Sequence, residues 1–217
     1  MVKVILLLFF LGGCATQYSP PEEYVAVSPD TELSCCLDIW SGADGVVGLR
    51  HTVFLEIQEE HRVLQGLMLV DRDRGQIRIA GLTEMGIKLF DLSVREQELE
   101  SHYLSEALGG RREAFAQLVA SSVRRIFLYS RPTPEAKVYM GPDSVLRYSS
   151  FQGKSVLQEC RQKDGLLKSV SCPRDNWYVD YTEYQDIDGV TLPERIIYND
   201  ERAGFRLVLV LHEVQEK

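Results

Sequence analysis

The sequence YTEYQDIDGVTLPERII, residues 181–197, decides the fold. Polar and apolar residues alternate on either side of Asp188-Gly189, a dipeptide that favours a two-residue turn between antiparallel strands. The pattern extends outward in both directions, so it predicts one strand at 177–184 and a second at 190–198. We therefore expect the chain to be built mainly from antiparallel hairpins.

Alternating runs separated by turn residues recur on the N-terminal side of this hairpin and again after it. The run 76–80 alternates polar and apolar residues, as a half-buried strand does. Similar runs predict further strands at 33–40, 48–58, 63–70, 87–94, 97–103, 145–151, 155–162, 166–171 and 205–213. The fold class is therefore mainly antiparallel β, with about ten strands and one inserted helix.

The inserted segment follows a helical period. Its apolar residues recur at spacings of three and four, at Phe115, Leu118, Val119, Val123 and Phe127. Polar residues occupy the other positions of the wheel, which predicts an amphipathic helix at about 112–128. The prolines of 131–134 end it.

The N-terminus has the features of an export signal. Lys3 precedes a short apolar run at 4–11, which is followed by Gly12, Gly13 and Cys14. The run is too short to span a bilayer, which needs about 20 apolar residues. We expect a signal peptide at 1–13, a lipidated cysteine with a tether at 14–30, and one domain at 31–217.

The end of the signal, Leu11-Gly12-Gly13-Cys14, resembles the lipobox of bacterial lipoproteins. The resemblance implies cleavage before Cys14 and attachment of lipid to that cysteine, with fatty acyl groups such as palmitate. Two or three acyl chains give stable membrane anchoring. Residue 15 is Ala and not Asp, which by the same resemblance implies the outer membrane, with the domain facing the periplasm. The alternative is an ordinary secretory signal followed by a chance cysteine.

Composition excludes several classes of function. The 217-residue chain has a formal net charge of -8, and no basic stripe that would suit nucleic acid. An acidic chain is also not drawn to anionic membrane surfaces. Membrane contact must then come from the anchor or from apolar surface.

Four cysteines follow Cys14, namely Cys35, Cys36, Cys160 and Cys172. An exported chain with an even number of cysteines suggests disulfides, and three pairings are open. Because Cys160 and Cys172 flank a predicted hairpin, we expect them to pair, although a tight turn there would leave them out of register. A metal site is the alternative, but no Cys-x-x-Cys or Cys/His spacing supports one.

Catalytic motifs are absent: the sequence holds no GxSxG, HExxH, P-loop or GxGxxG. His51 and His61 lie on adjacent predicted strands, where they would meet by chance more often than as a catalytic pair. The aromatic residues around Trp177 and Tyr181 are explained by sheet packing more often than by ligand stacking. We expect a protein that is not an enzyme and needs no cofactor; a hydrolase is the least favoured hypothesis.

The opening stretch, with the strand 205–214 after it, resembles the C-terminal part of the LolA/LolB superfamily of lipoprotein carriers and receptors. The run IAGLTEMGIKLFDL, residues 79–92, is similar to paired strands of LolB and its lipoprotein relatives. The resemblance implies an incomplete, half-open β-barrel with a helical lid over an apolar cavity that holds acyl chains. A lipobox fits LolB, which also carries an exposed apolar residue on a protruding loop. Here the loops at 59–62 and 71–75 are charged.

This resemblance implies an outer-membrane lipoprotein that binds lipid or an acylated protein, with a periplasmic carrier protein as a further partner. The residues expected to line the cavity are Leu55, Leu67, Leu69, Ile77, Ile79, Leu89, Phe90, Phe115, Leu118, Val119, Val123 and Phe127. Apolar residues at such spacings also form ordinary cores. The alternative function is therefore a structural or interaction lipoprotein of an envelope assembly, with a packed interior.

Overall fold

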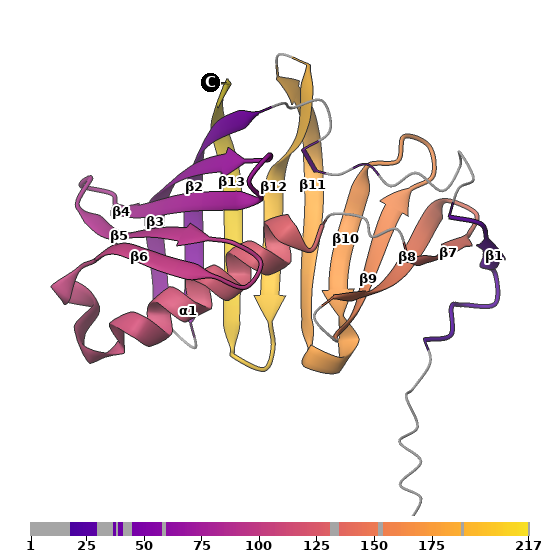
Figure 1. The fold of residues 1–217 in the computed structure, drawn as a ribbon, viewed down its shortest axis with the longest axis horizontal. Helices are drawn as coiled ribbons and strands as arrows, with labels where there is room; N and C mark the ends of the chain where they lie inside the picture. Colours follow the sequence, from indigo (N-terminus) through magenta and orange to yellow (C-terminus); the bar gives the residue numbers. More distant parts are fainter. Residues whose placement is uncertain are drawn as a thin grey trace, which may run out of the picture.

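One curved antiparallel sheet, against which one α-helix packs, makes up the described part of the molecule (Figure 1). The computed structural model describes residues 18–29, 37, 39–40, 45–57, 60–130, 135–151, 154–187 and 189–216. Every neighbouring pair of strands in this sheet is antiparallel. The predicted fold class is confirmed.

The order of the 13 strands across the sheet departs from the order in sequence. From one edge to the other they are β1 (Val25–Val27), β7 (Lys137–Met140), β8 (Ser144–Phe151), β9 (Lys154–Arg161), β10 (Leu167–Cys172), β11 (Trp177–Ile187), β12 (Val190–Asp200), β13 (Phe205–Glu216), β2 (Val46–Ile57), β3 (Glu60–Asp71), β4 (Gln76–Thr83), β5 (Lys88–Val94) and β6 (Leu99–Leu104). Among the described residues β1 and β6 pair on one side only, so the sheet is unclosed, as a half-open barrel requires.

The hairpin predicted between the strands at 177–184 and 190–198 forms as expected. Ile187 pairs with Val190 across the turn, and Gly189 adopts a φ of 86°, a conformation that favours glycine. The turn backbone is held by the N–H of Gly189, which donates to Asp186 Oδ1 at 3.1 Å. The C-terminal strand β13 then returns beside β2, and this pairing joins strands β2–β6 to strands β7–β12 in one sheet.

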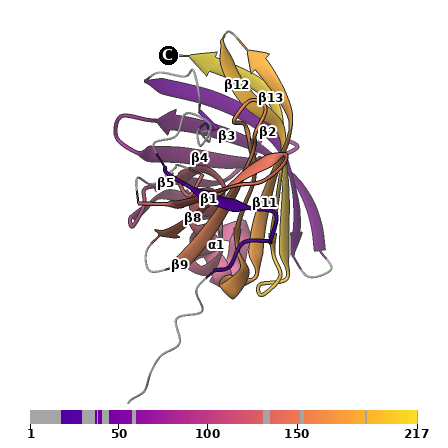
Figure 2. The ribbon, with the colours of Figure 1, turned by 90° about the vertical axis from the view of Figure 1, so that its right-hand side faces the viewer.

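The predicted helix is also present. It consists of α1 (Arg112–Val123) followed directly by a π-helical turn, η3 (Arg124–Leu128), so its extent matches the predicted 112–128. A short 3-10 helix, η2 (Glu106–Arg111), leads into it, and Gly109, at a φ of 65°, interrupts η2 with a non-helical conformation. Figure 2 shows α1 within the hollow of the curved sheet. Within the described ranges, helices long and apolar enough to cross a bilayer are not found.

The core lies between the concave face of the sheet and the helix. Its largest fully buried side chains include Trp40, Trp177, Tyr198 and Phe127. Ile39 and Trp40 fall within the strand predicted at 33–40, but in the structure they form a turn whose side chains enter this core. The other residues of that predicted strand, apart from Leu37, lie outside the described residues.

The segment after the expected lipidation site corrects a second prediction. The signal peptide and Cys14 lie outside the described residues, but the tether expected at 14–30 is packed on the sheet from Tyr18 onward. Its residues 25–27 form β1, paired with β7. The prediction treated the segment as a polar linker, and it overlooked two tyrosines and a valine-rich run with high strand propensity.

The predicted Cys160–Cys172 disulfide is wrong. Cys172 is a free, buried thiol, whereas Cys160 is disulfide-bonded. In the β9–β10 hairpin Cys160 pairs with Leu167, five residues before Cys172. Five residues of strand separate the two cysteines by about 16 Å, well beyond the roughly 7 Å between Cα atoms that a disulfide allows. Cys35 and Cys36 lie outside the described residues.

Candidate ligand-binding cavity

An apolar hollow lies where α1 crosses the concave face of β13 and β2–β5. It is lined by Val53, Leu55, Leu64, Gln65, Gly66, Met68, Ile79, Gly81, Phe90, Phe115, Leu118, Val119, Ser122, Val123, Ile126, Phe127, Phe205, Leu207 and Leu209. Only two of these residues, Gln65 and Ser122, have polar side chains, and Ser122 Oγ is engaged by the Leu118 carbonyl at 2.9 Å. The hollow therefore offers an apolar wall and almost no polar recognition.

The free volume of this cavity is about 60 Å³. Pockets that hold small organic ligands measure about 300–1,000 Å³. The hollow is therefore nearly filled by its own side chains when α1 is in this position.

Sequence reasoning found much of this lining. The expected residues that do line the cavity are Leu55, Ile79, Phe90, Phe115, Leu118, Val119, Val123 and Phe127. Ile77 is fully buried in the core next to the cavity, and Leu89 packs against that core without lining the hollow. Ligand binding by any of these residues stays a prediction.

Leu67 and Leu69 were placed wrongly, because they lie on the opposite face of the sheet. Their strand neighbours Leu64 and Met68 point inward and are buried, whereas Leu67 is 43% exposed. Residues 67–70 are apolar on both faces, so alternation alone did not fix which face is inside. Gln65 could have identified the outer face of this strand. Because it is polar and shares a face with Leu67 and Leu69, it favours the solvent side for all three.

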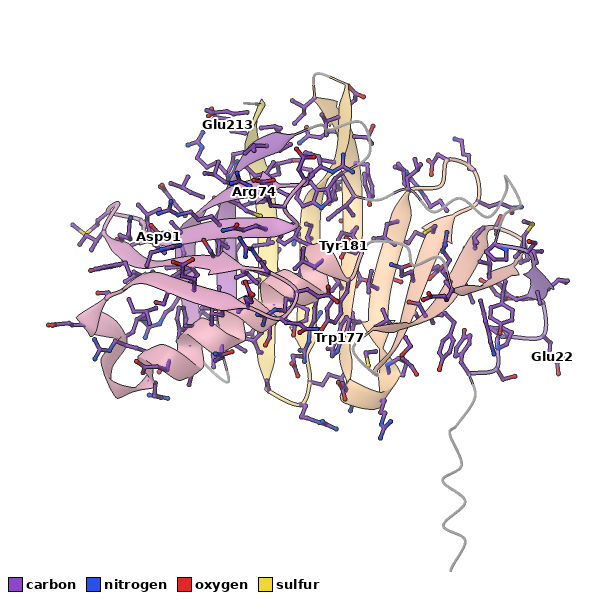
Figure 3. The ribbon with its side chains drawn as sticks, in the orientation of Figure 1. Glu22, Arg74, Asp91, Trp177, Tyr181 and Glu213 are labelled. Carbon is purple, nitrogen blue, oxygen red and sulfur yellow. The ribbon has the colours of Figure 1, made fainter. Side chains whose placement is uncertain are left out.

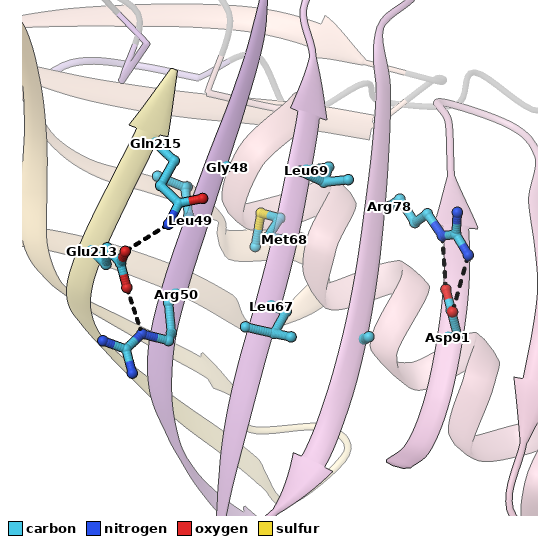
Figure 4. A pocket seen from close by; sticks show the side chains of 11 residues that line it. Gly48, Leu49, Arg50, Leu67, Met68, Leu69, Arg78, Asp91, Glu213 and Gln215 are labelled. Carbon is cyan, nitrogen blue, oxygen red and sulfur yellow. Dashed lines mark hydrogen bonds and ion pairs between the residues drawn. The ribbon is translucent and has the colours of Figure 1, made fainter. Parts of the chain in front are cut away.

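The outer face has a hollow of its own, of about 330 Å³, with Leu67 and Leu69 on its floor (Figure 4). Ion pairs flank it: Arg50 Nε lies 3.0 Å from Glu213 Oε2, and Arg78 donates twice to Asp91, at 2.9 and 3.1 Å. The hydrogen bonds from Arg78 lower the pKa of Asp91 to about 2. This hollow is wider than the cavity, but it is open and mixed in polarity.

Several cavity residues were missed on β2 and β3, from which other residues had been expected, and on β13, which had not been assigned to the site. Val53, Leu64 and Met68 come from the β2–β3 hairpin, and three more come from the last strand, β13. Phe205, Leu207 and Leu209 occupy alternate positions, so the period-2 pattern marks their shared face. What the sequence lacked was the pairing of β13 with β2, which joins residues about 150 positions apart.

Gly81 shows how tightly the sheet side of the cavity is built. A Cβ atom at Gly81 would lie 2.2 Å from Phe90 Cε1. The Phe90 ring fills this space and meets Phe115 of α1 edge to face, with ring centroids 5.5 Å apart. Gly81 therefore lets Phe90 lie flat on the sheet beneath the helix.

The C-terminal end of the helix is tied to the sheet by polar bonds. Tyr181 Oη donates to the Ile126 carbonyl, and Arg124 donates to the carbonyls of Arg95 and Glu98, both at 2.8 Å. Arg125 is hydrogen-bonded to Tyr198 and Asp200, and its guanidinium lies 5.1 Å above the Trp177 ring. Figure 3 shows Trp177 and Tyr181 at this end of the helix. The residues 124–128 are therefore fixed.

The rest of the helix is held differently. In the described part of the chain, no side chain of α1 makes a hydrogen bond or ion pair to the sheet; Ser122 bonds only within the helix. Phe115, Leu118 and Val119 are half-buried, and Gly109-Gly110 just before the helix has no neighbour that a Cβ atom would meet. The N-terminal two-thirds of the helix thus rests on apolar contact alone.

The histidines do not assemble a catalytic site. His51 pairs with Gly66 on β3, whereas His61 pairs with Glu56, so the two histidines are five strand positions apart. His51 faces the core, and burial, aided by nearby His212, lowers its pKa to about 4. Within the described ranges, no three His, Cys, Asp or Glu residues are grouped so that they could hold a metal ion.

One protruding turn carries exposed apolar residues that the sequence analysis did not identify. Met85 and Ile87, between β4 and β5, are 87% and 58% exposed. Of the charged segments expected to be loops, residues 60–62 belong to β3 and residues 72–75 connect β3 to β4, and residue 59 lies outside the described residues. An exposed apolar turn beside the cavity strands is thus present.

The unclosed sheet, the single helix in its hollow and the apolar cavity between them define a class of protein with a LolA-like, half-open barrel fold. The chain belongs to the family described as protein of unknown function (DUF3261), whose model matches residues 48–213. No curated protein matches the chain in sequence.

Solved structures with a similar fold include one described as a protein of the LolA superfamily. A LolA superfamily protein from Nitrosomonas europaea is 12% identical, with a TM-score of 0.49, over 80% of this chain and 86% of its own. A putative outer membrane lipoprotein-sorting protein domain from Vibrio parahaemolyticus is 6% identical, with a TM-score of 0.43, over 79% and 85%. A DUF1329 family protein from Desulfovibrio piger is 10% identical, with a TM-score of 0.45, over 81% and 87%. These identities are too low to transfer a function.

Proposed function

We propose that the protein is an outer-membrane-anchored periplasmic lipoprotein that binds the acyl chains of a lipid or an acylated protein. The acyl chain enters between α1 and the concave face of the sheet, and α1 acts as a lid. The protein is not an enzyme in this proposal and uses no cofactor. The observation that carries the proposal is the apolar hollow beneath α1, whose described side chains meet the sheet through apolar contacts without hydrogen bonds or ion pairs.

The size of the hollow sets the mechanism. At about 60 Å³ it holds no acyl chain, so α1 must move before a chain can enter. Lifting α1 exposes apolar surface at a cost of about 25 cal/mol per Å², and each CH₂ that replaces it returns about 0.8 kcal/mol. The two contributions oppose each other, so the exchange needs no nucleotide in this proposal.

Cys14 supplies the anchor in this proposal, and a soluble periplasmic carrier protein is the partner that hands over the ligand. The exposed turn with Met85 and Ile87 offers an apolar surface for contact with such a carrier. This turn is a candidate for the exposed apolar loop that the resemblance to LolB implies, which the charged segments near 60 and 73 do not provide.

The proposal is tested with the unlipidated chain, which lacks Cys14, and a fluorescent fatty acid. Saturable binding is expected, and Leu118→Trp, which fills the cavity, should weaken it about tenfold or more. Leu67→Trp is the matched control, because it makes the same exchange on the outer face and should leave binding unchanged. Absence of binding, together with absence of co-purified lipid, would contradict the proposal.

The second function is a structural or interaction lipoprotein of an envelope assembly. The observation that favours it is the same small free volume, since a filled interior suits a scaffold. The response of α1 to fatty acid distinguishes the two functions. In a scaffold α1 stays closed when fatty acid is present, whereas in a carrier it opens. Hydrogen exchange of the α1 amides with and without fatty acid reads this directly.

A further inference from the structure

The residues that follow the expected lipidation site are built into the fold. Tyr18 stacks on Tyr148, with ring centroids 5.0 Å apart, and meets Tyr139 edge to face at 6.2 Å. Tyr24 Oη is hydrogen-bonded to Ser144 Oγ at 2.7 Å. Residues 25–27 then pair with β7. We call residues 18–27 the N-terminal arm.

Gly141 provides the seat for this arm. A Cβ atom at Gly141 would lie 2.4 Å from Tyr24 Cε1, so only glycine leaves room for the ring. The φ of Gly141 is not positive, so its backbone conformation does not require glycine. Glycine is required here because any side chain would overlap the Tyr24 ring. The arm is therefore a specific fit and not a flexible linker.

The arm limits how far the domain can stand from its anchor. Cys14 and Tyr18 are four residues apart, and four residues of fully extended chain span at most about 14 Å. The polar interface of one bilayer leaflet is about 5–8 Å thick. If Cys14 carries lipid, Tyr18 lies at or just above the interface.

The edge of the sheet next to the arm suits that position. Tyr18, Tyr24, Tyr139 and Tyr148 are all half-buried, and tyrosine is enriched where proteins meet the membrane interface. Val25, on the edge strand itself, is 66% exposed. The exposed charged residues nearby are mostly acidic, so the contact would be made by aromatic and apolar groups, not by attraction to anionic lipid.

We propose that the arm orients the domain, with the β1–β7–β8 edge lying on the bilayer interface and the cavity held away from it. In Figure 1, β1 and β7 lie at one end of the long axis, and α1 with β4–β6 lies at the other. The cavity and the Met85 turn then face the periplasm, where a soluble partner can reach them. This inference rests on the lipid anchor of the proposed function.

Orientation is measured on the full lipidated chain in vesicles of phosphatidylethanolamine and phosphatidylglycerol with a headgroup nitroxide lipid. A fluorophore is placed at Lys137→Cys, on β7, or at Met85→Cys, in the distant turn. Cys172 is buried, and the chain without an added cysteine gives the labelling background. Nitroxide quenching is expected to be about threefold or more stronger at 137 than at 85 at all salt concentrations. Equal quenching, or stronger quenching at 85, would overturn the orientation.

Two further variants test the arm itself. Gly141→Val displaces Tyr24 and should bring the two quenching values together, whereas Gly110→Val, where no atom lies within 4 Å of an added Cβ, should not. Six Gly/Ser residues inserted after Ala15 leave the fold untouched and lengthen the reach to about 35 Å, with the same expected loss of contrast. If the difference in quenching between positions 137 and 85 persists after the insertion, the proposed role of the arm in orienting the domain would also be overturned.

Mass spectrometry of the N-terminal peptide first shows whether Cys14 carries lipid. An unmodified cysteine would overturn anchor and arm together, whereas lipid on Cys14 with equal quenching would overturn the arm alone. Fatty-acid binding is measured in a separate experiment, so a failure of the proposed ligand binding is distinguished from a failure of the anchor or of the arm.

Discussion

The two ends of the sheet are held together by different kinds of interaction. At the cavity end, formed by β13, β2–β6 and α1, the described side chains of α1 meet the sheet through apolar contacts, and Arg124 of η3 adds hydrogen bonds to the carbonyls of Arg95 and Glu98. At the arm end, formed by β1 and β7–β10, the buried face that carries the disulfide-bonded Cys160 also includes Arg147, Ser149 and Gln158. Directional bonds fix one arrangement, whereas apolar contacts can be exchanged for those of another apolar molecule. The difference separates a fixed end from an end that can open.

The helix spans the boundary between these ends. Its last turn, η3, is bonded to β11 and β12, and Gln158 Nε2 donates to the Tyr129 carbonyl just beyond it at 2.9 Å. Its first turns lie over the cavity. The π-helical turn is therefore the natural pivot, since distortions of this kind mark functional positions in helices.

The largest expected effect concerns the fixed end. Reduction of the Cys160 disulfide should lower the free energy of unfolding by about 2–4 kcal/mol, because the unfolded chain gains freedom. Denaturant unfolding with and without dithiothreitol measures this. Cys172→Ala should keep its sensitivity to the reductant, since Cys172 is free, and Cys160→Ala should lose it. The opposite pattern would restore a role for Cys172 in the bond.

The next effect concerns the sheet beneath the helix. Gly81→Ala should lower the free energy of unfolding by about 1–3 kcal/mol, because the added methyl overlaps the Phe90 ring. Gly48→Ala is the control, as its Cβ would meet its nearest neighbour at 3.4 Å. Thermal unfolding compares them, and equal stability of the two variants would show that Phe90 can move aside freely.

A smaller effect concerns the pivot. Tyr181→Phe removes the hydrogen bond to the Ile126 carbonyl and should cost about 1 kcal/mol. It should also speed hydrogen exchange at 124–128, which is otherwise the fixed part of the helix. Tyr178→Phe, on the exposed side of the same strand, is the control. Faster exchange only at 112–123 would mean that the pivot lies elsewhere.

The smallest effect concerns the outer face. The pKa of Asp91 is lowered to about 2 by Arg78, so its ion pair stabilises the fold above the ordinary aspartate pKa of about 4. The contribution is lost as the pH falls from about 4 to 2. Asp91→Asn should therefore be less stable than the unmutated chain at pH 7, and the difference should shrink over that window. A difference that is constant with pH would contradict this.

Sequence patterns predicted the elements with strong local signals. Asp188-Gly189 marked the β11–β12 hairpin, and the apolar spacing around Phe115 marked the helix. The short strands β1 and β7 carried too few residues to show a period. In β3, apolar residues on both faces concealed which of Leu67 and Met68 points inward.

Long-range contacts explain the remaining errors. The place of the arm depends on Tyr24 meeting Gly141, and the cavity wall depends on β13 meeting β2, and neither pairing leaves a local pattern. The disulfide error has a local cause, since a bridge between Cys160 and Cys172 needed a longer loop than the hairpin between them has. The register of β9 and β10 sets these cysteines far apart.

The most direct test of an opening end against a fixed end is hydrogen exchange of the unlipidated chain with and without a saturating fatty acid. Binding of about one fatty acid per chain should change exchange at 112–123 and leave 124–130 unchanged. If fatty acid does not bind, or if it changes exchange at 124–130 as much as at 112–123, the helix is not a lid and the packed scaffold is the better function.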